Sequence, residues 1–171
     1  MKKDYKYLFK NIGLLTISQF GTKLLSFLLV PLYTNILNTA EYGTYDMFNT
    51  TVNLLIPIVT FNIADSILVF ALDKNKSKNN VLSIGIKYAF IGTILVTILS
   101  FINKCFDIIK IFNDYWYYMP VLLFLIVMVS VLSCFARGID RVKETAISGV
   151  LCSAVMIGLN ILFLLYLRWG L

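Results

Sequence analysis

Four polar side chains share one face of the first long apolar stretch of the sequence. Thr16, Gln19, Lys23 and Ser26 are spaced three, four and three residues apart, which is the spacing of neighbours on a helix. Lys23 lies eleven residues into the stretch, about 16 Å along a helix axis. In a membrane such a charge would cost at least ~2.5 kcal/mol. We therefore expect this face to point toward protein or water, and Lys23 to line a functional cavity.

The second apolar stretch carries a comparable polar face. Its members are Asp46, Thr50, Asn53, Pro57 and Thr60, with Asn62 and Asp65 nearby. Pro57 should kink this helix, because proline lacks a backbone N–H and frees a carbonyl. Interrupted helices beside polar side chains are common where transporters line a cavity. Asn53 and Asp65 therefore join Lys23 and Gln19 as candidates for a substrate pathway.

A purely structural role is the alternative for the same side chains. In an antiparallel helix pair, Lys23 and Asp65 would differ in depth by about 9 Å, so they could pair only by stretching. Polar groups within a membrane also form interhelical hydrogen bonds of about 0.6 kcal/mol. For Asp65 the sequence favours neither role, and for Asn160 helix packing is the better interpretation.

The sequence carries no pattern typical of an enzyme. It contains no histidine, and its three cysteines, Cys105, Cys134 and Cys152, are widely separated. Neither a zinc site nor a disulfide framework is therefore indicated. The GxGxxG, P-loop, HExxH and GxSxG motifs are missing as well. We expect no catalytic residue, no cofactor and no metal site.

Membrane helices must position these polar groups. Hydrophobic residues make up 59% of the 171 residues and charged residues only 14%, against roughly 25% charged residues in a soluble domain. Apolar stretches recur along the whole length, so residues 1–171 are predicted to form a single membrane domain. The net charge of +6 comes from short basic clusters between these stretches, which fits membrane topology rather than a nucleic-acid partner.

Five stretches are long enough to cross a bilayer, which requires about 20 apolar residues. They cover approximately residues 12–37, 45–72, 81–102, 117–135 and 145–167. Because the backbone must satisfy its own hydrogen bonds in lipid, helices are expected. The predicted fold class is all-α, a polytopic membrane protein. The first stretch is too long for a signal peptide and is expected to be retained.

Lysine and arginine are distributed unequally between the two sides of these spans. One side carries ten and the other three. The ten are Lys2, Lys3, Lys6, Lys10, Lys74, Lys76, Lys78, Arg137, Arg141 and Lys143. Since the excess marks the cytoplasm, the amino terminus is predicted inside the cell and Leu171 outside. We interpret the cluster around Arg137 and Arg141 as a solvated loop that sets this orientation.

Four segments of the chain, in this order, carry a family resemblance. They are GTKLLSFLLVPLYTNILNTAEYGTYD, IPIVTFNIADSILVFALDKNKSKNNVLSIG, FARGIDRVKETAISGVL and LNILFLLYLRWGL. Together they resemble the amino-terminal part of a bacterial polysaccharide flippase of the Wzx type, for O-antigen or teichoic acid. The superfamily also includes the multidrug and toxic compound extrusion transporters. The resemblance implies a partial N-terminal lobe of that fold, truncated at its carboxyl end. One departure is Val69, where the family pattern has arginine.

The resemblance implies that the function is translocation of a lipid-linked oligosaccharide during polysaccharide biosynthesis, by alternating access. The partners would be the bilayer, a polyprenyl-pyrophosphate-linked oligosaccharide, and the missing part of the protein or another membrane chain. Lys23 would supply positive charge, and Gln19 and Asn53 would supply hydrogen bonds to sugar or phosphate. The implied location is the bacterial plasma membrane.

Two other functions remain open. A drug or cation exporter of the multidrug extrusion type would depend on Asp65 or Asp46 instead. A nonfunctional fragment or an accessory membrane subunit would only pack against partner chains, and the abrupt ending after a fifth span favours this alternative.

Overall fold

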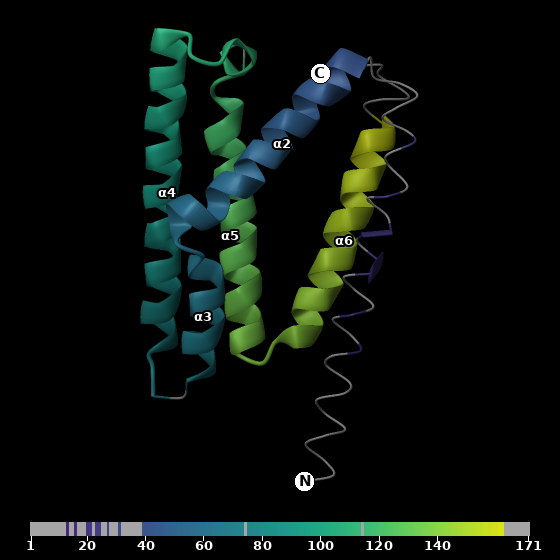
Figure 1. Ribbon diagram of the computed structural model, residues 1–171. Helices are drawn as coiled ribbons and strands as arrows, with labels where there is room; N and C mark the ends of the chain where they lie inside the picture. Colours follow the sequence, from purple (N-terminus) through teal and green to yellow (C-terminus); the bar gives the residue numbers. More distant parts are fainter. Residues whose placement is uncertain are drawn as a thin grey trace. The chain divides into compact units, whose positions relative to one another are not determined.

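The described residues are predominantly helical. The computed structural model describes residues 39–73, 75–113 and 115–162, together with Gly13, Thr16, Phe20, Gly21, Lys23, Leu24, Phe27 and Pro31. Its elements are α2 (Thr39–Thr60), α3 (Ile63–Leu72), α4 (Lys78–Phe106), the 3-10 helix η1 (Lys110–Phe112), α5 (Tyr118–Gly138) and α6 (Val142–Ile161) (Figure 1). No strand occurs in this part of the chain, which confirms the predicted all-α class.

The chain divides into two compact units, which are described separately. One unit is Thr44–Asp140 and contains most of α2 and all of α3, α4, η1 and α5. The other unit is Met1–Gly43 with Arg141–Leu171, and it contains α6. Lys23 and Asp65 therefore belong to different units.

Several of the described helices can cross a membrane. Three of them, α4, α5 and α6, are individually long and apolar enough, and α2 with α3 passes the same test as one span bent by 53°. The prediction of a polytopic helical membrane protein is confirmed at this level. The first predicted span, residues 12–37, lies outside the described residues except for isolated positions.

The bend between α2 and α3 lies at Phe61 and Asn62 rather than at Pro57. Both residues adopt the left-handed conformation, with φ of 50° and 51°, and two such residues in succession end an α-helix. Pro57 stays inside α2. The expected bend in this segment is present, but it lies at Phe61 and Asn62, so the prediction of a kink at Pro57 was wrong.

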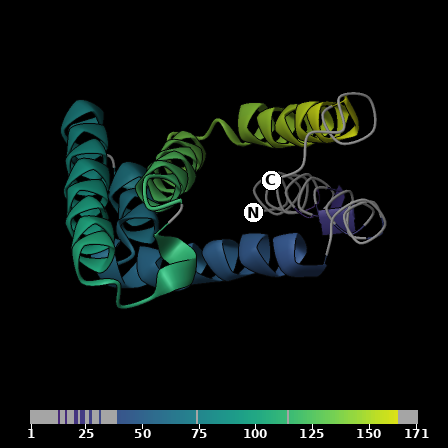
Figure 2. The ribbon, with the colours of Figure 1, turned by 90° about the horizontal axis from the view of Figure 1, so that it is seen from above.

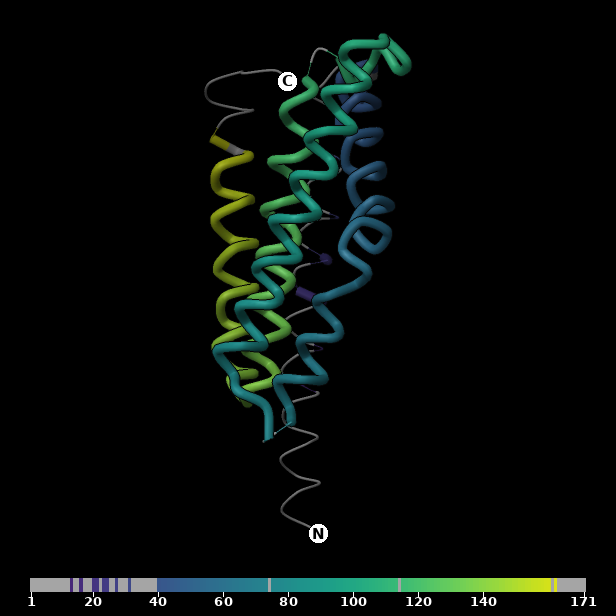
Figure 3. The backbone as a smooth tube through the Cα atoms, turned by 90° about the vertical axis from the view of Figure 1, so that its left-hand side faces the viewer, coloured from purple at the N-terminus to yellow at the C-terminus, as the bar shows by residue number. Residues whose placement is uncertain are grey.

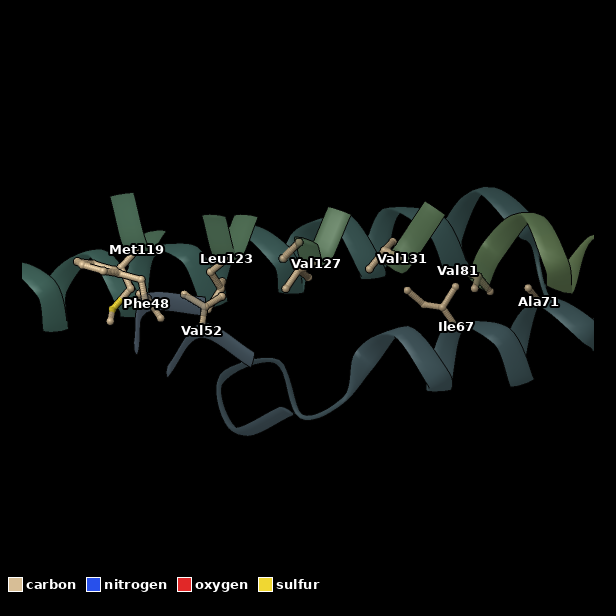
Figure 4. Close-up of a cluster of buried hydrophobic side chains, with 11 residues drawn as sticks. Phe48, Val52, Ile67, Ala71, Val81, Met119, Leu123, Val127 and Val131 are labelled. Atoms are coloured by element: carbon tan, nitrogen blue, oxygen red, sulfur yellow. The ribbon is translucent and has the colours of Figure 1, made fainter. Parts of the chain in front are cut away.

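α3, α4 and α5 form the packed centre of the Thr44–Asp140 unit. α4 and α5 run side by side along their length (Figure 3), and α3 lies against both of them (Figure 2). Their shared core consists of side chains that are at most 7% exposed, including Ile67, Val81, Leu123, Val127 and Val131 (Figure 4). Gly85 contacts Ile67, and Gly138 lies against Ala71. The carboxyl ends of α3 and α5 are therefore in direct contact.

A lysine closes the turn between α3 and α4. The Nζ atom of Lys78 donates hydrogen bonds to the carbonyl oxygens of Ala71 at 2.6 Å and Asp73 at 2.9 Å. The Asp73 side chain accepts a bond of 2.9 Å from the backbone N–H of Asn75. The two bonds from Lys78 satisfy carbonyls at the end of α3 that have no partner within the helix. The position of α3 against the start of α4 is thereby fixed.

An aromatic cluster holds α2 at the opposite end of the same unit. The ring of Phe48 meets Phe112 of η1, Tyr115 and Tyr118 of α5 edge to face, with centroids 4.9, 6.3 and 5.8 Å away. Phe48 is only 2% exposed. Such edge-to-face pairs are worth about 0.5–1.5 kcal/mol each beyond their buried area. The first half of α2 is thus anchored at one end of the unit. The break lies at the carboxyl end of α2.

Candidate functional site

A polar cavity of about 320 Å³ lies beside the α2–α3 break and is closed on another side by α5. We name it the break cavity. Its polar lining residues are Thr60, Asn62, Asp65, Ser130, Ser133, Cys134 and Arg137. Its apolar lining residues are Ile56, Ile63, Ala64, Val127 and Val129. Ligand pockets begin at about this volume, so the cavity is large enough for a polar group of headgroup size.

The break itself supplies one wall of this cavity. The side-chain amide of Asn62 donates a hydrogen bond of 2.6 Å to an Asp65 carboxylate oxygen, and the Asp65 backbone N–H donates to the Asn62 carbonyl at 3.2 Å. One Asp65 oxygen is therefore committed to the local structure of the break. The other oxygen remains free to accept a hydrogen bond, since Asp65 is exposed.

Arg137 supplies the cation of the cavity. It lies in the last turn of α5, where the negative end of the helix dipole favours positive charge. Its Nε donates to the Ser133 carbonyl at 3.4 Å, and one terminal nitrogen donates to Cys134 Sγ at 3.0 Å. No carboxylate pairs with this guanidinium among the residues that the structure describes. Most of its five N–H donors are therefore available to an anionic ligand.

Hydroxyl groups complete the polar lining. Thr60 donates to the Ile56 carbonyl at 2.7 Å, so its hydrogen is already used within α2. Within the described part of the chain, the hydroxyls of Ser130 and Ser133 make no hydrogen bond. Together with Arg137, these two serines present donors from one face of α5. The cavity can therefore bind a multiply charged oxyanion or a sugar through α5.

The four candidate residues predicted from the sequence have different outcomes. Asp65 lines the break cavity. Asn53 does not line this cavity. Its side-chain amide instead donates to the Asn49 carbonyl at 2.9 Å and to Asn49 Oδ1 at 3.3 Å. Lys23 is exposed but lies in the other compact unit. Gln19 lies outside the described residues.

Arg137 was missed as a site residue by sequence reasoning. The cluster around it was interpreted as a solvated loop that sets topology, yet Arg137 is helical and only half-exposed. Ser130, Ser133 and Arg137 are spaced three and four residues apart, which places them on one helical face. The spacing rule that identified the face around Lys23 would have identified this face too.

The described groups around the break cavity are suited to non-covalent binding. In the described ranges, no group of three or more His, Cys, Asp or Glu side chains is placed to hold a metal ion. Cys134 is buried, whereas Cys105 and Cys152 are exposed. What the cavity combines is one guanidinium, one carboxylate and several hydroxyls beside a bend in a membrane span. Such groups are able to bind a polar ligand through charge and hydrogen bonding.

Apolar helices of spanning length and a polar cavity beside a broken span define a polytopic helical membrane protein. A family model described as polysaccharide biosynthesis protein matches residues 8–170. The chain therefore belongs to this family of polysaccharide biosynthesis proteins, and the resemblance to polysaccharide flippases is confirmed. Members of the family are transporters and flippases rather than enzymes. No curated protein and no solved structure matches the chain.

Proposed function

We propose that this chain takes part in moving a lipid-linked oligosaccharide across the bacterial plasma membrane, by alternating access. Family membership supports polysaccharide-related transport in general. The cargo we propose is an oligosaccharide carried on a polyprenyl pyrophosphate, which is both strongly anionic and rich in hydroxyls. Moving such a group past hydrocarbon requires a polar cavity with compensating charge.

The observation that carries the proposal is the position of Arg137. Its guanidinium lines a cavity between the α2–α3 break and α5, a helix of spanning length, and has no carboxylate partner in the described part of the chain. A charged side chain in a membrane protein usually faces a bundle interior or a substrate path. Arginine is also suited to phosphate, because its planar donors match two phosphate oxygens at once. We infer that Arg137 contacts the pyrophosphate.

The α2–α3 break supports the transport step of this proposal. Two successive left-handed residues, Phe61 and Asn62, separate α2 from α3, and the cavity opens beside them. A broken span can change its bend without losing the hydrogen bonds of either helical half. We propose that such a movement changes access to the break cavity between the two sides of the membrane.

The remaining predicted residues keep their place in the proposal. Lys23 would supply a second positive charge, and Gln19 and Asn53 would supply hydrogen bonds to sugar or phosphate. The proposed topology has the amino terminus and the turn around Asp73 on the cytoplasmic side. The Arg137 end of α5 then lies on the same side, where the carrier is first loaded.

Binding of a short-chain polyprenyl pyrophosphate to the purified chain in detergent tests the proposal. The Arg137→Ala variant should bind at least tenfold more weakly, because a hydrogen bond to a charged group contributes about 1.5–3 kcal/mol. Arg137→Lys should recover part of the affinity, since it restores charge without the planar donors. Arg141→Ala is the matched control, because Arg141 is exposed and does not line the cavity. Equal binding by Arg137→Ala and the wild type would overturn the assignment.

Export of an organic cation is the second candidate, and the Asp65 carboxylate in the cavity favours it. Uptake of an organic cation into vesicles that carry the chain should then fall in the Asp65→Asn variant, while pyrophosphate binding stays unchanged. The opposite pattern, with uptake unaffected and pyrophosphate binding dependent on Arg137, supports the oligosaccharide carrier. The Arg137→Ala and Asp65→Asn variants thus distinguish an oligosaccharide carrier from an organic cation as the transported molecule.

A further inference from the structure

A second cavity, of about 320 Å³, lies between α3 and α4 near the turn that joins them. We name it the α3–α4 groove. It shares one residue, Ile63, with the break cavity and is otherwise distinct from it. Apart from Ile63, none of its lining residues lines the cavity of the proposed transport mechanism.

Most of the α3–α4 groove is apolar and shaped like a trough. Its floor is formed by Ile67 and Val81, which are 2% and 7% exposed. Its walls are formed by Phe70 and Ile84, which are 49% and 48% exposed. A buried apolar floor between exposed apolar walls, on helices long and apolar enough to span a membrane, is suited to contact with a hydrocarbon chain. A hydrocarbon chain in the groove would give its apolar side chains the van der Waals contacts that an empty gap lacks.

The end of the groove beside the α3–α4 turn is polar and basic. Lys76, Ser77 and Asn80 line this end. The Nζ atom of Lys76 lies 5.5 Å from the centroid of the Phe70 ring, which places the cation over the apolar wall. Lys78, by contrast, has its Nζ bonded to two carbonyl oxygens. Of the two described lysines at this turn, Lys76 is therefore the one that is available to a ligand.

A further cation lies on the same face of α4. Lys87 follows Asn80 by seven residues and Ile84 by three, so the three share one helical stripe. The side chain of Lys87 is exposed, and a lysine at such a depth extends toward the membrane surface. The nearby Asp73 carboxylate is engaged by the Asn75 backbone. Asp73 does not line the groove, so the charged side chain in its lining is Lys76, and Lys87 adds a second positive charge on the same face of α4.

We propose that the α3–α4 groove binds one anionic phospholipid of the adjoining leaflet. Its phosphate contacts Lys76 at the polar end, and one acyl chain lies in the trough between Phe70 and Ile84. The continuity of a cationic end with an apolar trough selects an amphiphile over a soluble anion, which would use only the polar end. The proposal is independent of the transport function, because neither Arg137 nor Asp65 takes part in it.

Lipid retention measured by native mass spectrometry tests the site. The purified chain is mixed in detergent with equal amounts of phosphatidylglycerol and phosphatidylcholine of identical acyl chains. We expect the wild type to retain one phosphatidylglycerol with roughly fivefold preference, which is the effect of one lysine on an anionic lipid. Lys76→Gln should lose this preference. Lys104→Gln is the matched control, because Lys104 lies at the far end of α4 against Trp116, 4.8 Å from its ring centroid, and should keep the preference.

A second variant tests the apolar trough separately from the charge. Ile84→Trp adds bulk to an exposed wall and should abolish retention of both lipids while the thermal unfolding temperature stays near that of the wild type. Equal retention of the two lipids by the wild type would overturn the proposal, as would undiminished retention by Ile84→Trp. Inorganic phosphate alone should give no thermal stabilisation. Stabilisation by phosphate would identify a soluble-anion site and reject the lipid.

Discussion

The side-chain amide of Asn62 and the carboxylate of Asp65 are joined by a 2.6 Å hydrogen bond at the start of α3. Asn62 is left-handed, with φ of 51°, and asparagine is one of the few residues that adopt this conformation routinely. The same residue therefore ends the regular backbone of α2 and orients the carboxylate of the break cavity. Asn62 thus contributes both to the bend and to the polar lining of the cavity.

Asn62→Ala should lower the free energy of unfolding by about 2 kcal/mol. It removes the hydrogen bond to Asp65 and keeps a β-carbon in a left-handed backbone without the polar side chain that lets asparagine adopt this conformation, which costs about 1–2 kcal/mol. Asn62→Gly removes the same hydrogen bond but also the β-carbon, so it relieves the backbone strain and should cost about half as much. Chemical unfolding in mild detergent, followed by circular dichroism, measures both variants. Equal stability of the alanine and glycine variants would show that the backbone conformation at Asn62 is not a source of strain.

The contact between Gly85 and Ile67 leads to a prediction about packing. A β-carbon added at Gly85 would meet the Ile67 side chain and would lie 2.9 Å from Val131 Cγ1. Gly85→Ala should therefore lower the unfolding temperature, because overpacking typically costs about 1–3 kcal/mol. Gly158→Ala is the control, since nothing lies within 4 Å of its added carbon. It should be neutral or stabilising, as alanine is the better helix former.

A double variant identifies the neighbour responsible for that loss. Ile67→Val removes the terminal methyl that lies nearest to Gly85, at a cost of its own of about 0.5–1.5 kcal/mol. In this background Gly85→Ala should cost less than it does in the wild type, so the two changes should be non-additive. Strict additivity in the unfolding measurement would mean that Val131, rather than Ile67, limits the space at Gly85.

The helices of this protein follow from sequence more readily than its cavity does. Runs of apolar residues predict α4, α5 and α6 because length and hydropathy alone determine whether a helix can span a membrane. The break at Phe61 and Asn62 has a weaker signal, since only Asn62 is a residue type that adopts the left-handed conformation readily and Phe61 is not. Pro57, the residue with the strongest local signal, stays inside α2.

Among the cavity residues too, one could be predicted from the sequence and another depends on which helices are in contact. Asp65 was predicted because a carboxylate within an apolar stretch is conspicuous. Arg137 was assigned to a loop because basic residues at span ends usually set topology. Its role as a lining residue depends on the contact between the ends of α3 and α5, where Gly138 meets Ala71. A hydropathy pattern contains no information about which helices touch.

Cys105 provides a test of the proposed topology. It is exposed and lies in the last turn of α4, at the end that the distribution of basic residues predicts to be outside. A membrane-impermeant maleimide added to intact cells should label Cys105, and Cys105→Ser should abolish that labelling. Cys134 is buried and should stay unlabelled until the protein is unfolded. Labelling of Cys105 only after the membrane is opened would reverse the assigned orientation.

Lys76 and Lys78 are two residues apart, yet they should respond differently to loss of charge. The Nζ atom of Lys78 bonds the carbonyls of Ala71 and Asp73, so Lys78→Met should lower the free energy of unfolding by about 1.5–3 kcal/mol. Lys76→Met should leave stability in lipid-free detergent within about 0.5 kcal/mol of the wild type, as expected for an exposed side chain. Chemical unfolding of the two variants under identical conditions measures this difference. If Lys78→Met were as stable as Lys76→Met, the two carbonyls at the end of α3 would be satisfied equally well by water, and the turn would not depend on its lysine.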